Sequence, residues 1–195
     1  DSYCPLIRIG DFAKSIIEPL RFKRVPIQAS ELGVPFFGTS SMMWIEPQPS
    51  YHLPKRMAGI VNYLVDECTV LVPRSGQLNG LIGTAVLPIG DLIGGAITED
   101  AIRINCHTVT DAGYLLISLH SEYGRRQVKA RAFGSSIPHL NVDQLGKVLI
   151  FDLDEDVRLE IGSMGAEIAK LRNKAIQLES EAIKRIDGII EGVVR

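Results

Sequence analysis

The sequence predicts an α+β fold, in which one globular domain with a twisted β-rich core and short helices precedes a long C-terminal, coiled-coil-like helix. Three observations predict it. Short β-branched runs between glycine-rich turns fill much of the first 150 residues and are typical of strands. The spacing becomes helical after residue 111. From residue 157, apolar residues recur at alternating gaps of four and three, as in a heptad helix.

Composition agrees with one domain and an appendage. The chain has 195 residues, of which 46% are hydrophobic and 23% charged, which is ordinary for a globular protein. No apolar run has the length of a membrane span. The three cysteines are widely spaced and odd in number, which favours free thiols in a reducing compartment. We therefore expect a cytoplasmic location and no membrane partner.

The first elements are short. Residues 6–18 fit either a short helix or a strand and a turn, and residues 19–56 are loop-rich in Pro, Ser and Gly. Within that loop-rich region VPFF, residues 34–37, predicts a strand that runs into a turn at GTS. The β-branched run from Thr69 to Val72 predicts a second strand.

The middle of the chain changes from strands to helix. Strands are predicted within residues 84–89 and 94–106, with alternation from Ala101 to Ile104. A turn is expected at Thr110-Asp111, followed by helical spacing over residues 112–133 with an interruption at Gly124. A polar loop then leads to a strand within 142–153. Trp44 is expected in the core.

The last segment, residues 151–195, is predicted to be a long helix that begins near residue 155. Its seam must find a partner helix in another copy, another half of the chain or another subunit, and the alternative is that it folds back on its own domain. The seam residues are Val157, Ile161, Met164, Ile168, Leu171, Ala175, Leu178 and Ala182.

Motifs for catalysis or metal binding are missing. The sequence lacks a phosphate-binding GxxxxGK[ST] loop, a GxGxxG turn and paired Cys/His zinc spacing. Asp152, Asp154 and Asp156 begin like a calcium loop, but Val157 stands where glycine is needed. An acidic helix N-terminus explains them better. We therefore expect no cofactor, no metal and no catalytic site.

The net charge of −2 does not suggest nucleic-acid binding. The acidity lies in the C-terminal segment, because residues 148–195 hold ten acidic and seven basic residues. Two basic clusters stand out in the domain. They are Arg21, Lys23 and Arg24, and Arg125, Arg126, Lys129 and Arg131. A charge cluster by itself is usually a solvated face.

Three stretches together resemble a known family. They are ELGVPFFGTSSM (31–42), DECTVLVPRSGQLNGLIGTAVL (66–87) and RAFGSSIPHLNVDQLGKVLI (131–150), the last followed by the long helix. In this order they resemble one target-recognition half of the specificity (S) subunits of type I restriction-modification systems, and of related bifunctional methylase-nucleases. The family usually has two such halves and two helices. The tail after residue 151 is closer to the type II-like versions.

The resemblance implies a division of labour. Residues 1–150 are expected to read double-stranded DNA as a non-catalytic target-recognition domain, and residues 151–195 to dimerise or dock a partner. Partner subunits would methylate adenine and cleave in host defence. The expected partners are a DNA methylase subunit and, as a further implication of the resemblance, a nuclease/translocase subunit. A homodimer through the helix is a separate expectation. The alternatives are a structural coiled-coil assembly protein and a recognition fragment of a larger methylase-nuclease.

The candidate DNA contacts follow from residue chemistry and from this resemblance. Bidentate amides and Arg read base edges, whereas Lys, Arg and Ser suit phosphates. Gln77 and Asn79 are the candidates for base edges and Arg74 for base or phosphate, with an ordinary surface turn as the alternative. Glu122 or Asp143 is the alternative partner for one or two of the basic residues. The full candidate set is Lys23, Arg24, Arg74, Ser75, Gln77, Asn79, Arg125, Arg126, Lys129, Arg131, Ser135, Ser136 and His139.

Overall fold

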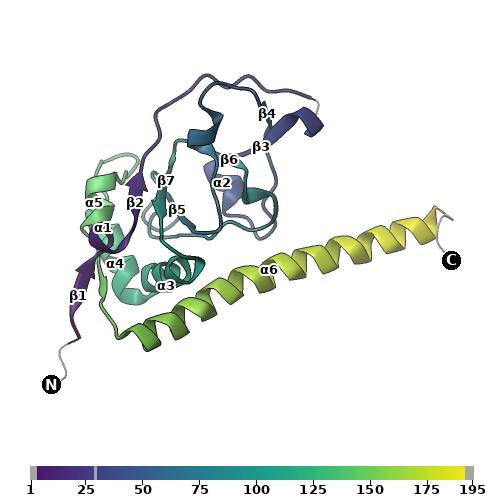
Figure 1. The fold of residues 1–195 in the computed structure, drawn as a ribbon. Helices are drawn as coiled ribbons and strands as arrows, with labels where there is room; N and C mark the ends of the chain where they lie inside the picture. The colour runs from purple at the N-terminus through teal and green to yellow at the C-terminus, as the bar shows by residue number, and fades with distance from the viewer. Residues whose placement is uncertain (1–3, 29, 192–195) are drawn as a thin grey trace.

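The computed structural model describes residues 4–28 and 30–191 and confirms the α+β fold (Figure 1). The strands are β1 (Leu6–Arg8), β2 (Ser15–Ile17), β3 (Gly33–Phe37), β4 (Tyr51–Pro54), β5 (Thr69–Pro73), β6 (Ala96–Ile97), β7 (Ala101–Asn105) and β8 (Leu149–Phe151). The α-helices are α1 (Ile9–Phe12), α2 (Thr39–Met42), α3 (Val109–His120), α4 (Glu122–Arg131), α5 (Val142–Gly146) and α6 (Glu155–Ile190). Short 3-10 turns cover Ser30–Leu32, Ile60–Tyr63 and Gly90–Leu92.

The strands form small sheets that stack on one another. The central sheet has the antiparallel order β2-β7-β5. A second sheet has the order β4-β3-β6, in which β3 and β6 run parallel. The chain ends of the domain meet in the antiparallel pair β1-β8. Figure 1 shows the central sheet between the β3-β4 layer and α3.

Strand β5 is buried on both faces, which explains its unbroken apolar run. Val70 and Val72 join the core cluster that contains Leu115 and Leu119 of α3. Leu71, which points to the opposite face, joins the cluster of Phe37 and Ile97. Two-sided burial of this kind produces continuous rather than alternating hydrophobicity. The strand prediction at residues 69–72 is confirmed.

Arg103 of β7 is a buried cation in this two-sided core. It is 2% exposed, and its guanidinium donates to the carbonyl oxygens of Ile97 (2.6 Å), Ala101 (3.2 Å) and Tyr63 (3.3 Å). Desolvation by burial lowers its pKa to about 10. Carbonyl oxygens therefore compensate part of the desolvation cost of this charge, and the side chain ties β7 to β6.

Several local predictions are wrong in detail. Residues 6–18 contain a short helix between two strands, so both alternatives are present in part. Residues 84–89 form no strand, and Val86 makes an isolated bridge to Leu71. The expected turn at GTS is the start of α2. The segment 142–153 begins with α5, whose capping box joins Asn141 and Gln144, before β8 follows.

The predicted turn at Thr110-Asp111 and the predicted interruption at Gly124 are also wrong, because the break between α3 and α4 lies at Ser121. Thr110 and Asp111 lie in the first turn of α3, because the Thr108 hydroxyl caps that helix by accepting from the Asp111 N–H at 3.0 Å. Ser121 separates the two helices and caps α4 in the same way through Gly124 N–H. Gly124 is needed inside α4, since a Cβ there would overlap the Ser118 carbonyl oxygen.

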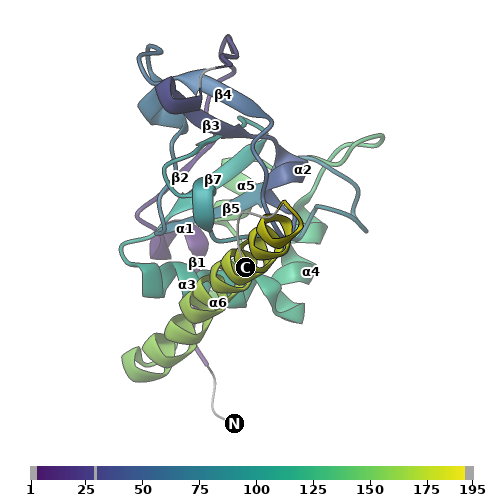
Figure 2. The same cartoon turned by 90° about the vertical axis from the view of Figure 1, so that its right-hand side faces the viewer.

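Helix α6 has 36 residues, which corresponds to a length of about 54 Å, and the predicted helix is confirmed. Residues 192–195 of the predicted segment lie outside the described residues. Figures 1 and 2 show α6 crossing beneath α3 and then extending beyond the domain. No helix in the described part of the chain combines the length and the apolar character that a bilayer crossing requires.

Glycine residues form the contact at which α3 and α6 cross. Gly162, Gly165 and Ala166 are the buried residues of α6, and they face Gly113 of α3. A Cβ on Gly113 would lie 2.7 Å from the Ala166 backbone nitrogen, and a Cβ on Gly162 would overlap the Thr110 carbonyl oxygen. The two backbones therefore touch directly, as in small-residue helix crossings.

Most of the heptad seam lies outside this crossing, and of the seam residues that the structure describes only Ile161 packs against the main core. Met164, Ile168, Leu171 and Leu178 of the seam are 57%, 45%, 56% and 57% exposed. Folding back on the domain therefore leaves most of the seam uncovered, because α6 docks through its glycine face instead.

Candidate nucleic-acid interface

Two loops far apart in the sequence are joined by their backbones. The loop 74–80 follows β5, and the hairpin 133–139 follows α4. The Gly76 N–H donates to the Pro138 carbonyl at 3.2 Å, and the Leu140 N–H donates to the Arg74 carbonyl at 2.7 Å. Ser75 also pairs with His139 as an isolated antiparallel bridge. The second and third stretches of the resemblance therefore meet in space.

The loop presents two amide side chains to solvent. Gln77 and Asn79 are exposed, and Ser75 is half-buried beside the hairpin. Gly76 has a φ of 152°, and a Cβ there would press on the Leu81 side chain at 3.1 Å. The loop is thus held in one conformation while its amides remain free to donate and accept, as direct reading of base edges requires.

Helix α4 adds two cations to the same region. A Cβ on Gly83 would lie 3.2 Å from Lys129 side-chain carbons and 3.3 Å from a side-chain carbon of Arg125. Both side chains therefore pack over the segment that closes the loop. Among residues 4–28 and 30–191, no ion pair involves either of them, and Arg125 donates to the His120 carbonyl oxygen at 3.4 Å.

We call this region the loop–hairpin surface. The green segment after α4 extends beyond the body of the domain in Figure 2, and its tip carries two exposed serines. The candidate residues that the structure brings together here are Ser75, Gln77, Asn79, Arg125, Lys129, Ser135 and Ser136.

Three other basic residues that were predicted to contact DNA form ion pairs or hydrogen bonds within the chain. The Arg74 Nε lies 2.9 Å from a Glu18 carboxylate oxygen, and its Nη1 lies 3.7 Å from Asp100. Arg126 pairs with Glu122 at 2.5 Å, which was the alternative for this cluster. Arg131 donates to the carbonyls of Gln127 and Lys147.

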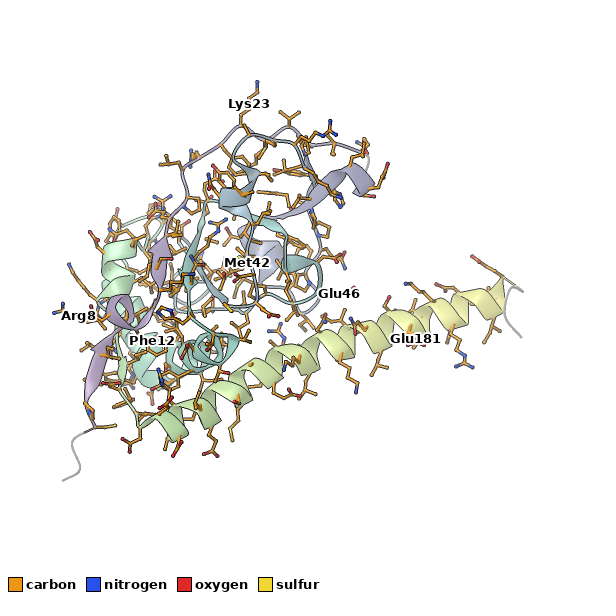
Figure 3. All side chains as sticks on the ribbon, in the orientation of Figure 1. Arg8, Phe12, Lys23, Met42, Glu46 and Glu181 are labelled. Atoms are coloured by element: carbon orange, nitrogen blue, oxygen red, sulfur yellow. The ribbon has the colours of Figure 1, made fainter. Side chains whose placement is uncertain are left out.

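Lys23 and Arg24 belong to another part of the domain. Arg24 pairs with the carboxylate of Glu99, and its guanidinium carbon lies 4.9 Å from the centre of the Phe36 ring. Lys23 is exposed and projects on the side away from α6 (Figure 3). The structure therefore does not assemble all predicted cations into one surface.

His139 holds the base of the hairpin. Its backbone exchanges two hydrogen bonds with Phe133, at 2.7 and 2.9 Å, and its ring centre lies 6.2 Å from that of Phe133. The His139 Nδ1 is buried without a hydrogen-bond partner among the described residues. The contacts of this residue are thus with Phe133 across the hairpin and, through its backbone bridge, with Ser75 of the loop.

Sequence reasoning missed the exposed apolar residues. Trp44 was expected in the core but is 53% exposed, and the adjacent Ile45 is 82% exposed. Leu78, Phe133 and Ile137 stand out on the loop and the hairpin at 42%, 50% and 57% exposure. Neither periodicity nor charge marks such positions, because loops have no face that must be buried.

The remaining titratable groups offer little chemistry. The three cysteines are free, and burial raises the pKa of Cys106 to about 12, which keeps its thiol protonated. Burial also lowers the pKa of His120, whose Nε2 lies 2.9 Å from the Ala85 carbonyl oxygen. Across the residues that the structure describes, no group of three or more His, Cys, Asp or Glu could hold a metal.

Solved structures share this fold. The HsdS subunit from Thermoanaerobacter tengcongensis superposes with a TM-score of 0.57 at 14% identity, over 90% of this chain and 39% of that chain. A chain from a study of complex assembly and conformational transition in a type I R-M system gives a TM-score of 0.57 at 13% identity, over 97% and 44%. This chain therefore spans about two fifths of the length of each. No protein-family model and no curated protein matches the sequence.

Proposed function

We propose that this chain recognises a double-stranded DNA sequence as half of the specificity subunit of a type I restriction-modification system. The observation that carries the proposal is the fold shared with S subunits over nearly the whole chain. The loop–hairpin surface supports it, because it carries exposed amides, hydroxyls and two cations that form no ion pair with the described residues. In this proposal the chain has no catalytic site.

The proposed partners supply the chemistry. Residues 1–150 read the duplex, and residues 151–195 hold that reader on a DNA methylase subunit, with a nuclease/translocase subunit joining the complex. Methylation of adenine and cleavage are assigned to those subunits, and the system serves host defence in the cytoplasm. A type II-like methylase-nuclease is the other setting in which the same reader would work.

Duplex binding tests the proposal, and its salt dependence tests the two cations. We expect the chain with its methylase partner to bind duplex DNA at about 50 mM salt and to lose affinity steeply as salt rises. Because each phosphate contact contributes about 0.9 to the slope of log K against log salt, Arg125→Ala with Lys129→Ala should reduce the slope by about 2. Fluorescence anisotropy measures it.

Lys174→Ala is the matched control for this experiment. Lys174 is an exposed cation on α6, outside the loop–hairpin surface, so its loss should leave the slope unchanged. If the unaltered chain and its partner bind no duplex at low salt, the proposed function is wrong. If they bind but the double variant keeps the full slope, the phosphate contacts lie elsewhere.

The exposed seam of α6 favours self-association. We expect two copies to pair through Leu171 and Leu178, because a heptad stripe on an isolated helix gains stability by burying its apolar side chains against another helix. Light scattering should then give about twice the 21.4 kDa of one chain. Leu171→Asp with Leu178→Asp should give a monomer, since two buried carboxylates per chain cost more than the pairing returns.

Ser163→Asp provides the control, because Ser163 is an exposed α6 residue outside the seam. It should keep the mass of the unaltered chain. A monomeric mass for the unaltered chain, with and without residues 155–195, would exclude self-pairing and leave the partner subunit as the occupant of the seam. The same exposed seam also favours the second candidate function, a structural assembly protein.

A further inference from the structure

Three exposed apolar side chains belong to the two segments of the loop–hairpin surface. Leu78 lies on the loop, Phe133 at the base of the hairpin and Ile137 near its tip. A single exposed apolar residue needs no explanation. These three differ because the two segments that carry them are bonded to each other through Gly76 and Pro138. Polar candidate contacts, Gln77 and Ser136, are their direct neighbours in the chain.

The hairpin is closed in a way that keeps Phe133 and Ile137 outside. Phe133 exchanges both backbone hydrogen bonds with His139. Gly134 has a φ of 107°, and a Cβ there would come within 2.9 Å of the Ile137 carbonyl oxygen. These constraints fix the path of the backbone on both sides of the two apolar residues. The backbone that carries the two apolar side chains is therefore constrained before any contact forms, which lowers the cost of ordering it on binding.

We infer that Phe133 and Ile137 of the hairpin form an apolar wedge that enters the minor groove and partly unstacks one base step of the bound duplex. The inference rests on the proposed function. Minor-groove proteins use the same residue types to kink DNA, and bending lets more of the protein surface reach the duplex. In this surface, the exposed serines of the hairpin and the cations of α4 would meet the phosphates that flank the opened step.

The wedge is distinct from two other roles for these side chains. Apolar residues also contact thymine methyl groups without unstacking the bases, and they also dock protein partners. The duplex is favoured here because polar residues suited to DNA neighbour the apolar residues in the chain, and because two cations of α4 pack over Gly83, which follows the same loop. A protein interface would favour a continuous apolar centre.

The test uses the whole chain with duplexes that the unaltered chain and its methylase partner have selected from a random pool. Dyes at the two ends of a selected duplex report bending by energy transfer. The unaltered chain should bend the duplex by an angle in the range of about 20–90°. Phe133→Ala with Ile137→Ala should remove the bend and weaken binding roughly tenfold to a hundredfold.

Val61→Ala is the control, because Val61 is 71% exposed on the 3-10 turn that packs against β6; it should leave the bend intact. Ile137→Ala alone lies at an exposed position and should reduce the bend without lowering the unfolding temperature. Binding without bending, or a bend that survives the double variant, overturns the wedge. The wedge is also overturned if the duplex stays unbent and replacing thymine by deoxyuridine weakens binding as much as the double variant does. Absence of any binding by the unaltered chain overturns the proposed function together with the wedge.

Discussion

Replacing Gly162 by valine should lower the free energy of unfolding by about 3 kcal/mol, because the new side chain overpacks a helix crossing that has no spare volume. The atom in the way is the Thr110 carbonyl oxygen, which belongs to the backbone of α3 and cannot rotate aside. The small gain in helix propensity over glycine does not offset this cost. The variant should also expose residues of α3 that α6 covers.

Denaturant unfolding followed by circular dichroism measures this effect as a shift of the midpoint. Ser163→Val is the matched control, since it introduces the same side chain at the next, exposed position of α6, and it should change stability by less than about 1 kcal/mol. Equal midpoints for the two variants would show that α6 does not depend on the glycine contact for its position.

Replacing Gln77 and Asn79 by alanine should abolish most sequence selectivity while leaving duplex binding at low salt. Each bidentate amide contributes about 1–3 kcal/mol of discrimination between bases, so the pair should account for roughly a hundredfold preference or more. Non-specific binding rests on cations such as Arg125 and should persist. The seam of α6 is untouched, so assembly should persist as well.

Competition between a selected duplex and a scrambled one measures this loss. Asn62→Ala, which removes an exposed amide outside the loop–hairpin surface, is the control and should keep the preference. Undiminished selectivity in the double variant would place base reading elsewhere on the domain. An unaltered chain that assembles but never discriminates between duplexes would favour the assembly protein over the DNA reader.

Local sequence patterns predicted the elements that are long or buried on both sides. The heptad spacing gave α6, and the β-branched run gave β5, because both patterns repeat within a short window. The same pattern did not reveal that α6 docks through Gly162 and Gly165, since glycine has a low helix propensity and normally destabilises a helix interior. Which face meets the domain depends on Gly113, about fifty residues earlier.

The sequence predicted which residue types form the candidate site, but not which of those residues lie near one another. Ser75 and His139 come together only because the segments that follow β5 and α4 pair through their backbones, and no short window of sequence contains both. Whether a cation is engaged within the chain is likewise a tertiary property, since Glu18 pairs with Arg74 across the domain. Arg103 was hidden for the same reason: its partners are carbonyl oxygens, which every residue carries.

The separation of the two faces of α6 has an evolutionary consequence. The glycine face that attaches the helix admits almost no substitution, whereas the seam that carries Leu171 and Leu178 can change without disturbing that attachment. Partner choice can therefore drift, or be engineered, independently of how the reading domain is mounted. Helix α6 thus separates the residues that attach it to the domain from the residues that are free to meet a partner.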